Sequence, residues 1–389
     1  MINNQTENEW IVLKNNVGDK DYFAELCESI SDSIGSCTVY SSTKSWVPPK
    51  KVRLINSVPY VKKSNFTKLI SWIKYFIGSV SFLLNLKKKS NLFIVCSPPI
   101  LPIAGFLYKK LYHKEYILWI DDIYPDIFYS QNIISKNNFI AKLWEGVNQQ
   151  TFKYAKNLIT ISPLMSKRLS RYVPKNNSKE KIKIIPTWVD TDEIRPIKKR
   201  NNRFAIEHDQ LNKMTVVYSG NFGKTHDIKT LIKVAEQLSF DDEINFLFIG
   251  EGQDFEFYKE KKYNLKNTRF LSWQPRNELK YSLACADIGM VTLQKGIEEL
   301  SMPSKTYYYM AAGAAIIGVS DIPSDLNMLL NQNKCGFNFK PGSIKEISDK
   351  ILFLKSNKKT LNECKQHSRS YAINYVSKKK CIKKVLRLL

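Results

Sequence analysis

Residues 214–238 read MTVVYSGNFGKTHDIKTLIKVAEQL and hold a complete strand, turn and helix. The beginning of the stretch is apolar and β-branched, which predicts a buried strand. The end repeats apolar residues at helical spacing, and Gly220 and Gly223 occupy the turn between the two elements. Backbone N–H groups in such a turn can approach a phosphate, although tight turns use glycine for other reasons as well. The stretch therefore predicts one unit of a parallel α/β sheet and marks a candidate ligand edge.

Ten further segments have the composition of buried strands. They are EWIVLKN, SCTVYSS, LFIVCSPP, YILWIDD, NLITIS, KIKIIP, INFLFIGEG, TRFLSW, IGMVTL and AAIIGVS. Helical stretches separate most of them, and this order builds parallel sheets with helices on both faces. We therefore predict an α/β protein with two doubly wound domains.

The length of the chain also favours two domains, because 389 residues exceed what one hydrophobic core usually serves. Residues 191–213 are polar and charged, and they predict a linker. We expect a first domain at residues 1–190, a second at residues 191–372, and a C-terminal helix at residues 373–389 that packs back on the first domain.

The chain is strongly basic. Lys and Arg number 60 against 36 Asp and Glu, which gives a formal net charge of +24. Such a charge favours a polyanionic partner or an anionic membrane surface. Part of the excess has a plainer explanation, because asparagine is abundant too and an AT-rich genome favours lysine codons. No recognised nucleic-acid-binding motif accompanies the charge, so we do not expect nucleic acid as the partner.

The cysteines and the first residues bear on the compartment. The seven cysteines are scattered and show no CxxC spacing, so we expect reduced thiols rather than a disulfide framework or a zinc site. The beginning, MINNQTENEW, lacks the charged-then-apolar order of a secretory signal. These features predict a cytoplasmic protein.

The longest apolar stretch is ISWIKYFIGSVSFLLNL, residues 70–86. Lys74 and several polar residues interrupt it, and it falls short of the roughly 20 apolar residues that a spanning helix needs. Two interpretations remain open. The stretch is a core helix of an α/β domain, or it lies in the plane of an anionic membrane. In the second interpretation Trp72, Tyr75 and Phe76 lie at the headgroup level, and the flanking lysines are Lys62, Lys63, Lys68 and Lys87–Lys89.

Residues 301–313, SMPSKTYYYMAAG, combine a helix start with a candidate anion site. Pro303 suits the first turn of a helix, and Ser301 or Ser304 is placed to cap the free amides. The amides at this end and the ammonium of Lys305 would attract an anion. We expect this segment to be both a buried helix and a ligand wall.

Taken in order, these motifs resemble bacterial glycosyltransferases of the GT-B fold, specifically glycosyltransferase family 4 and its group 1 members. The resemblance covers nearly the whole chain and is strongest at residues 214–342. Its carriers are CSPP, WIDDIYPD, ISPLMSKRL, IIPTWVDTDEIRP, YSGNFGKTHD, FIGEG, FLSWQPRNEL, LACADIGMVTL and MPSKTYYYMAAGAAIIGVSD. The resemblance implies two Rossmann-like domains facing a central cleft. The first domain would bind the acceptor and the second the nucleotide-sugar donor.

The resemblance implies a donor site built by residues of the second domain. The candidates are Gly220, Asn221, Lys224, His226, Glu251, Trp273, Gln274, Ser304, Lys305 and Tyr308. Asn221 stands where the family usually has a phosphate-binding arginine, and His226 lies near the usual partner lysine. Both changes remove fixed charge, so Lys224 and Lys305 are the candidates for neutralising the diphosphate.

Two further positions follow from the same resemblance. Tyr308 stands at the second of the family's paired glutamates, while Glu298 or Glu299 falls near the first. A tyrosine there can hydrogen-bond a hydroxyl group, stack on a ring or belong to the core. Trp273 and Gln274 lie in a turn that resembles the region in contact with the nucleobase.

The acceptor side offers three acids in WIDDIYPD, namely Asp121, Asp122 and Asp126. A carboxylate after this strand can orient or deprotonate an acceptor hydroxyl, and it can also simply cap the next turn. We favour Asp122 as the catalytic residue. The family generally retains anomeric configuration without an enzyme nucleophile, so catalysis would rest on positioning and on charge stabilisation. We expect neither a metal nor a cofactor, since the nucleotide sugar is a substrate.

The expected function is transfer of a sugar from a nucleotide donor, with UDP favoured, to a lipid-linked saccharide carried on undecaprenyl diphosphate. The setting would be capsule or O-antigen assembly at the inner face of the cell membrane, with the protein peripherally attached. Two alternatives share the fold: a nucleotide-sugar epimerase and a non-catalytic scaffold.

Overall fold

The structure is a computed structural model of the chain. It describes residues 9–18, 22–43, 46–61, 64–174, 176, 178–223, 226–252, 254–260 and 265–389. The chain forms two compact units. One comprises Met1–Pro186 together with Ile382–Leu389, and the other comprises Thr187–Cys381.

The first unit is built on a seven-stranded sheet whose order is β3-β2-β1-β4-β5-β6-β7. All of its pairings are parallel. The strands are β1 (Trp10–Leu13), β2 (Cys37–Ser41), β3 (Val52–Asn56), β4 (Asn91–Val95), β5 (Tyr116–Ile120), β6 (Asn157–Thr160) and β7 (Ile182–Ile184). The central strands β1, β4 and β5 are apolar and almost wholly buried, as strands covered on both faces must be.

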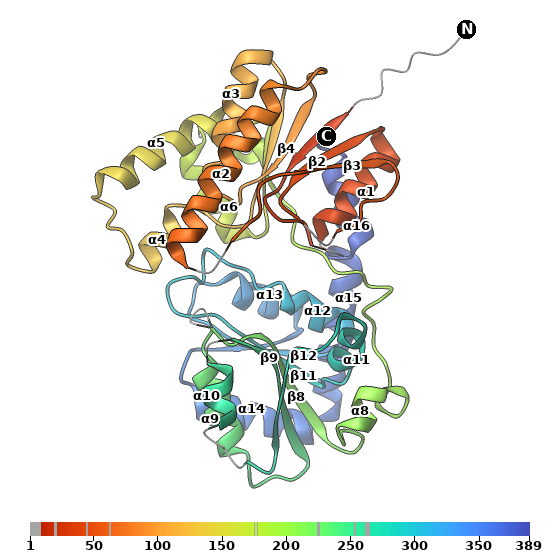
Figure 1. The fold of residues 1–389 in the computed structure, drawn as a ribbon. Coiled ribbons are helices and arrows are strands. Elements are labelled where there is room, and N and C mark those ends of the chain that lie inside the picture. The colour runs from red at the N-terminus through yellow and green to blue at the C-terminus, as the bar shows by residue number, and fades with distance from the viewer. Residues whose placement is uncertain are drawn as a thin grey trace. The chain divides into compact units, whose positions relative to one another are not determined.

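The helices of the first unit connect consecutive strands. They are α1 (Tyr22–Ile34), α2 (Asn65–Leu84), α3 (Pro102–Tyr112), α4 (Asp126–Ser130), α5 (Phe139–Tyr154), α6 (Pro163–Leu169), η1 (Ser170–Tyr172) and α7 (Ser178–Lys181). Helices α2, α3 and α5 lie side by side (Figure 1). The last helix of the chain, α16 (Lys378–Leu386), contributes its C-terminal part to this unit, where Lys156 Nζ donates a hydrogen bond to the carbonyl oxygen of Leu388 at 2.9 Å.

Helix α2 contains most of the apolar stretch 70–86. Ser71, Tyr75, Ser79 and Leu83 recur at helical spacing and are buried, and the hydroxyl of Tyr75 donates to the carbonyl oxygen of Tyr40 at 2.8 Å. The helix therefore packs into the domain, as the first interpretation requires. In the part of the chain that is described, no helix has the length and hydropathy needed to cross a bilayer.

The second unit is built on a six-stranded parallel sheet whose order is β10-β9-β8-β11-β12-β13. Its strands are β8 (Met214–Asn221), β9 (Ile244–Glu251), β10 (Thr268–Leu271), β11 (Ile288–Thr292), β12 (Ala315–Val319) and β13 (Gly336–Phe339). The order reverses between β8 and β11, because β9 and β10 lie on one side of β8 and the later strands on the other. Ligands of open parallel sheets bind at such a switch point, outside the carboxyl ends of the strands.

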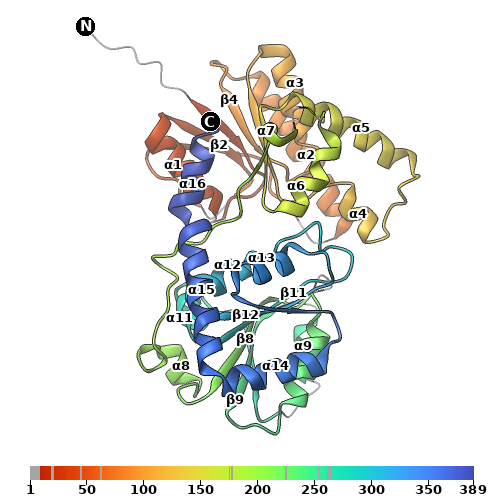
Figure 2. The ribbon, with the colours of Figure 1, turned by 180° about the vertical axis from the view of Figure 1, so that it is seen from behind.

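The helices of the second unit cover both faces of this sheet. They are η3 (Lys199–Asn201), α8 (Arg203–Glu207), α9 (Ile228–Gln237), α10 (Phe255–Glu260), η4 (Arg276–Glu278), α11 (Leu279–Ala284), α12 (Lys305–Ala312), α13 (Asp325–Asn333), α14 (Ile344–Ser356) and α15 (Lys358–Tyr375). Helices α9 and α14 lie side by side (Figure 2) and share a hydrophobic core with β8 and β9. On α12, Tyr309 packs its ring against Gly289 of β11, where an added Cβ would lie 2.4 Å from a ring carbon.

The predicted fold class is confirmed, since both units are parallel α/β sheets covered by helices. All eleven predicted strands are present, and the structure adds β3 and β13 at sheet edges. Residues 191–213 do not run as a free linker. Asn202, Phe204 and Ala205 are buried, and Lys199 forms an ion pair with Asp287 at 2.6 Å, so this stretch is folded into the second unit.

Candidate functional site

Two glycines shape the carboxyl edge of the second sheet. Gly220 of β8 pairs with Gly250 of β9, and both adopt φ values of +154° and +151° that side chains rarely reach. A Cβ on Gly220 would lie 2.4 Å from Lys305 Nζ, so the bare backbone is what lets that ammonium approach the strand. Glycine at position 220 therefore leaves room for the Lys305 side chain at the carboxyl edge of the sheet, where ligands of this class of fold bind.

Lys305 is the first residue of α12, and its side chain reaches back over β8. Its Nζ lies 4.2 Å from the ring centroid of Tyr218 and donates a hydrogen bond to the Tyr218 hydroxyl at 3.1 Å. Among the described residues no carboxylate pairs with it, and burial lowers its pKa to about 7. The hydroxyl and ring face of Tyr218 compensate only part of the free-energy cost of burying this ammonium. An anion that binds beside Lys305 would therefore stabilise its charged form.

His226 lies beside this lysine at the end of the glycine turn. Its Nδ1 is 3.1 Å from the carbonyl oxygen of Thr292, and a carbonyl in that position accepts a hydrogen bond from a protonated Nδ1. Burial and the charge of Lys305 lower the pKa of His226 to about 4, although the Thr292 carbonyl opposes them. The imidazole is therefore neutral at pH 7, and Lys305 carries the positive charge at this point.

The start of α12 points its free amides toward the same edge. Ser304 occupies the N-cap position with helical backbone angles, φ −58° and ψ −30°, and its side chain makes no capping hydrogen bond. The expectation that Ser304 caps these amides through its hydroxyl is therefore wrong. Gly313 ends the helix in the left-handed conformation, with φ +78°.

The three consecutive tyrosines have different environments. Tyr307 and Tyr309 are buried, and the Tyr309 hydroxyl accepts a hydrogen bond from the backbone N–H of Ser219 at 2.7 Å. Tyr308 is only half-buried. Two of the three thus belong to the core, and Tyr308 alone keeps a side chain that a ligand can contact.

Four further donor candidates that the structure describes lie at strand ends or in the loop after β10. Asn221 pairs with Glu251 in the sheet, and both side chains are exposed. Trp273 has 57% of its surface exposed, and the Gln274 side-chain amide donates to the carbonyl oxygen of Ser272 at 2.9 Å. Lys224, the other candidate for the diphosphate, lies outside the described residues.

The sequence reasoning missed Tyr218. Its hydroxyl accepts from Lys305 and donates to the carbonyl oxygen of Asn221 at 2.9 Å, so it links the lysine to the glycine turn. In the sequence it appears only as one more apolar residue of a buried strand. The alternation of β8 assigns it to the core, and no local signal marks its hydroxyl.

Glu298 was noted only for its position, and its environment is unusual. The side chain is 8% exposed, and its Oε2 accepts from the backbone N–H of Gly296 at 2.7 Å. Its other oxygen, Oε1, is buried and has no hydrogen-bond partner in the part of the chain that the structure describes. This carboxylate precedes α12 by a short loop and leaves one acceptor unsatisfied.

In the first unit, the three acids of WIDDIYPD separate into different roles. Asp121 accepts hydrogen bonds from Trp119 Nε1 at 2.5 Å and from the Tyr22 hydroxyl at 3.1 Å, and burial raises its pKa to about 6. Asp122 has an exposed side chain. Surrounding protein atoms raise the pKa of Asp122 by partial desolvation, and the positive charge of Lys68 opposes that rise.

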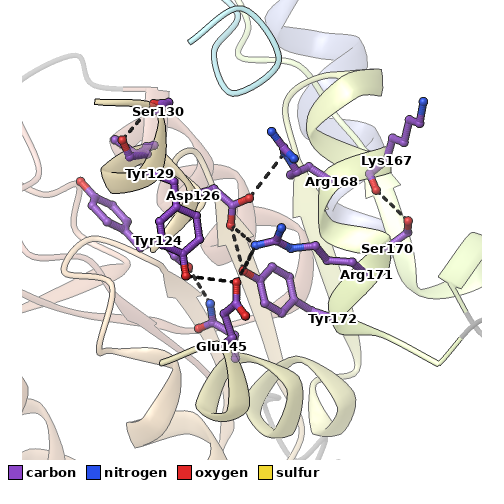
Figure 3. Close-up of polar contacts among 12 residues, drawn as sticks. Tyr124, Asp126, Tyr129, Ser130, Glu145, Lys167, Arg168, Ser170, Arg171 and Tyr172 are labelled. Carbon is purple, nitrogen blue, oxygen red and sulfur yellow. Dashed lines mark hydrogen bonds and ion pairs between the residues drawn. The ribbon is translucent and has the colours of Figure 1, made fainter. Parts of the chain in front are cut away.

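Asp126 is buried and is the centre of an ionic network whose other members are partly exposed (Figure 3). Arg171 pairs with it at 2.7 Å, Arg168 Nε lies 3.5 Å from its other oxygen, and the Tyr172 hydroxyl donates to it at 2.8 Å. Arg171 also contacts Glu145 of α5 at 3.1 Å. These contacts join α4 to the segment α6–η1 and engage both oxygens of Asp126, so Asp122 is the one of the three acids whose side chain is exposed.

No group of three or more His, Cys, Asp or Glu side chains suited to a metal ion occurs within the described ranges. All seven cysteines are buried.

Several known proteins resemble this chain. Residues 199–371 match the family model of glycosyl transferases group 1. A probable glycosyltransferase of Pseudomonas aeruginosa, WbjE, is 22% identical over 331 residues, which cover 82% of this chain and 81% of that protein. A putative colanic acid biosynthesis glycosyl transferase of Escherichia coli strain K12, WcaI, is 22% identical over 57% of this chain and 55% of its own length.

A solved structure shows the same fold. HepE of Anabaena, in complex with UDP and glucose, superimposes with a TM-score of 0.69 at 11% identity, covering 97% of this chain and 98% of that one. At this identity the likeness establishes the architecture only. Together, the comparisons identify the chain as a glycosyltransferase of the GT-B fold, and its residues 199–371 resemble the group 1 glycosyltransferases.

Proposed function

We propose that the protein moves a sugar from a UDP-linked donor to a lipid-linked saccharide during assembly of a bacterial surface polysaccharide, such as capsule or O-antigen. The observation that carries the donor half is the ammonium of Lys305, which lies beside Gly220, is desolvated and has no carboxylate partner among the residues described. The names of two similar proteins support the setting: one structure holds UDP and glucose, and one relative is described as a colanic acid enzyme.

In this proposal the diphosphate lies against Gly220, the amides at the start of α12 near Ser304, and the ammonium of Lys305. A helix N-terminus and a lysine are a suitable pair for an anion that develops charge as the sugar leaves. Lys224 would add charge. The nucleobase would meet Trp273 and Gln274, while Asn221, His226, Glu251 and Tyr308 would contact the ribose and the sugar.

The chemical step would need no covalent enzyme intermediate. The bond between the anomeric carbon and the diphosphate breaks, the acceptor oxygen bonds to that carbon on the same face, and the acceptor proton leaves. Lys305 and the helix amides would stabilise the departing diphosphate, and Asp122 would orient the acceptor hydroxyl and receive its proton or pass it to the leaving group. The anomeric configuration is retained in this course.

The acceptor half of the proposal depends on the outer face of α2. Opposite its buried face, the helix exposes a second set of apolar side chains: Phe66, Leu69, Ile73, Ile77 and Leu84. Four of these recur at intervals of three and four residues and so form one stripe. Exposed apolar stripes of this size mark interaction surfaces rather than ordinary protein exterior. Both interpretations of residues 70–86 thus have support, one on each face of the helix.

Helix α5 adds to this surface. Phe139, Ile140 and Leu143 are exposed in its first turns. The ring of Tyr124, near Asp122, lies 6.2 Å from that of Trp72 on α2 and 6.0 Å from that of Trp144 on α5. The apolar segments of α2 and α5 therefore flank the loop that carries Asp122.

Basic residues accompany the stripe. Lys68 and Lys74 lie on α2, Lys87 and Lys88 follow it, and Lys142 lies on α5. Lysine next to exposed apolar side chains is the composition of helices that lie in the interface of an anionic bilayer. We therefore propose that α2 and the start of α5 rest on the inner face of the cell membrane, where a lipid-linked acceptor is found.

We expect the triple variant Phe66→Ser, Ile73→Ser, Ile77→Ser to bind anionic vesicles about tenfold or more weakly than the unchanged protein, because it removes apolar area from the contact. The measurement is co-sedimentation with phosphatidylglycerol and phosphatidylcholine vesicles. Transfer to a short water-soluble acceptor should be unaffected.

The matched control replaces the same residue types, one phenylalanine and two isoleucines, at exposed positions of the second unit. It is the triple variant Phe240→Ser, Ile206→Ser, Ile373→Ser, whose positions are all exposed. This control should bind vesicles as the unchanged protein does. If the α2 variant, the control variant and the unchanged protein all co-sedimented with the vesicles to the same extent, α2 would not be the membrane-binding surface.

The pKa of Lys305 predicts how donor binding depends on pH. In the absence of donor, the Lys305 side chain has a pKa of about 7 and is largely neutral above that pH. Binding of a diphosphate favours the charged ammonium, so above pH 7 the lysine must take up a proton when the donor binds. The affinity for the donor therefore falls as the pH rises. Between pH 6 and 8 we expect a loss of about tenfold for a UDP-sugar. His226 stays neutral throughout this window because its pKa is about 4. Calorimetry in two buffers of different ionisation heat measures both the affinity and the proton uptake.

Lys305→Met should bind more weakly and lose the dependence on pH in this window. A flat profile for the unchanged protein would mean that Lys305 does not meet the diphosphate.

The decisive test of the proposed function separates it from its two rivals. A thermal-shift screen over UDP, GDP and their common sugars identifies the donor, since a ligand that binds the folded state raises Tm. The selected donor is then incubated with and without a polyprenyl-diphosphate saccharide. We expect transfer only when the acceptor is present. Conversion of the free nucleotide sugar without acceptor would establish an epimerase, and stabilisation without any reaction would establish a scaffold.

A further inference from the structure

The second unit has a pocket at the edge opposite the donor site. Its volume is about 510 Å³. It is lined by Lys199, Leu211, Asn212, Lys213, Met214, Glu243, Asp287, Lys355, Lys358, Leu361, Asn362 and Lys365, a set we call the lysine pocket. Met214 begins β8 and Asp287 directly precedes β11, so the pocket lies at the amino ends of the strands whose carboxyl ends form the donor edge.

Three of the five lysines in this lining are neutralised by carboxylates. Lys199 and Lys365 share Asp287, at 2.6 and 2.9 Å, and Lys355 contacts Glu243 at 2.7 Å. Although burial opposes the effect, Lys365 and Lys199 lower the pKa of Asp287. These pairs hold the pocket walls in place and fix where its remaining charges stand.

The other two lysines, Lys213 and Lys358, have no ion-pair partner among the described residues. Lys358 is the first residue of α15, an 18-residue helix whose Asn357 side chain caps only the N–H of Thr360. The positive end of that helix therefore opens beside the two unpaired ammonium groups. The lining carries five lysines against two carboxylates, and a third carboxylate, that of Asp241, contacts Lys355 at 2.6 Å from outside the lining. The excess of positive charge that remains favours an anion.

The pocket also has an apolar component. Met214 and Leu361 are buried in its wall, and Leu211 is exposed at its margin. Its volume falls within the range of sites for small molecules, which spans roughly 300 to 1,000 Å³. The lysine pocket thus has an apolar wall and two lysines held by a shared carboxylate. A chance depression among surface lysines would have neither feature.

We propose that the lysine pocket binds a phosphorylated small molecule at a site separate from the donor site. The separation follows from β8, which runs from Met214 in the pocket to Gly220 at the donor edge. A strand advances about 3.3 Å per residue, so these positions are about 20 Å apart. One molecule cannot occupy both sites, and the ligand of the lysine pocket binds whether or not a nucleotide is present.

The test uses pyrophosphate as the probe and calorimetry in the presence of saturating UDP, which occupies the donor edge. We expect saturable binding of one pyrophosphate per chain. The double variant Lys213→Gln, Lys358→Gln removes both unpaired charges and should weaken this binding about tenfold or more. Both side chains lack ion pairs, so the variant should fold and bind UDP as before.

The matched control is Lys345→Gln, Lys359→Gln, which removes two exposed lysines of the same unit outside the pocket lining. It should leave pyrophosphate binding within about twofold of the unchanged protein. Equal weakening by both double variants would overturn the proposal, because the effect would then come from net charge. Absence of saturable binding under saturating UDP would overturn it as well.

Discussion

The Lys305→Met enzyme is expected to show kcat/KM for sugar transfer lowered by about 100-fold or more, because one preorganised charge at the leaving group is lost. The same substitution should not lower stability. The ammonium is desolvated in the folded state and has no carboxylate partner among the described residues. Its pKa is lower in the folded chain than the ordinary value of 10.5, so below about pH 7 its charge disfavours folding and methionine removes that cost.

The measurement combines initial rates with thermal unfolding at pH 6.5, with and without UDP. We expect Tm of the free variant to equal or exceed that of the unchanged protein, and the shift caused by UDP to disappear. Lys345→Met, an exposed lysine of α14, serves as the control and should change neither quantity. Undiminished transfer by Lys305→Met would refute the phosphate assignment, whereas a lower Tm would show that the lysine is structural.

Gly250→Ala is expected to destabilise the second unit by about 3 kcal/mol, the largest effect on folding that we predict. An added Cβ would lie 1.9 Å from the carbonyl oxygen of Gly220, which is a backbone atom and cannot rotate away. The φ of +151° adds strain of its own. To admit the methyl group, β8 and β9 must separate where they form the donor edge. We therefore expect the variant to lose UDP binding as well as stability.

Urea unfolding and a UDP titration measure these two effects. Gly146→Ala on α5 is a suitable control, because no atom lies within 4 Å of the added carbon. It should stabilise its helix by up to about 1 kcal/mol. If Gly250→Ala unfolded at the urea concentration of the unchanged protein, the close pairing of the two glycines would be disproved.

The strands that could be predicted from sequence were largely those of the sheet interiors. Strands such as β5 and β12 are short apolar runs, because helices cover both of their faces. The missed strands, β3 and β13, lie at sheet edges and are largely half-buried or exposed. Their sequences, VRLIN and GFNF, mix polar residues or glycine with apolar ones. Edge position alone does not prevent prediction, since the edge strands β7 and β10 were predicted from KIKIIP and TRFLSW. It is the mixed composition of β3 and β13 that carried no strand signal.

The residues of the candidate site also fall into those that sequence could predict and those that it could not. The carboxyl-edge rule predicts Gly220 and Lys305 from sequence, since each lies where an element begins or ends. The hydroxyl of Tyr218 beneath the lysine, and the bond from Tyr22 to Asp121, depend on contacts between residues 87 and 99 positions apart. The neutral state of His226 likewise needs the carbonyl of Thr292. Charge states arise from burial and partners, which no linear motif encodes.

The aromatic contacts around Tyr124 offer an optical readout for the proposed lipid contact of α2. Indole emission shifts with the polarity around the ring, and Trp72 lies on the helix whose outer face we propose to meet the membrane. Trp144 also stacks on the Tyr124 ring, at an interplanar angle of 14°. A tilt of α2 caused by lipid would therefore change the emission of tryptophans that contact Tyr124, which is two residues from Asp122 in the sequence. Binding of an acceptor lipid would then become visible without a label and before any sugar had moved.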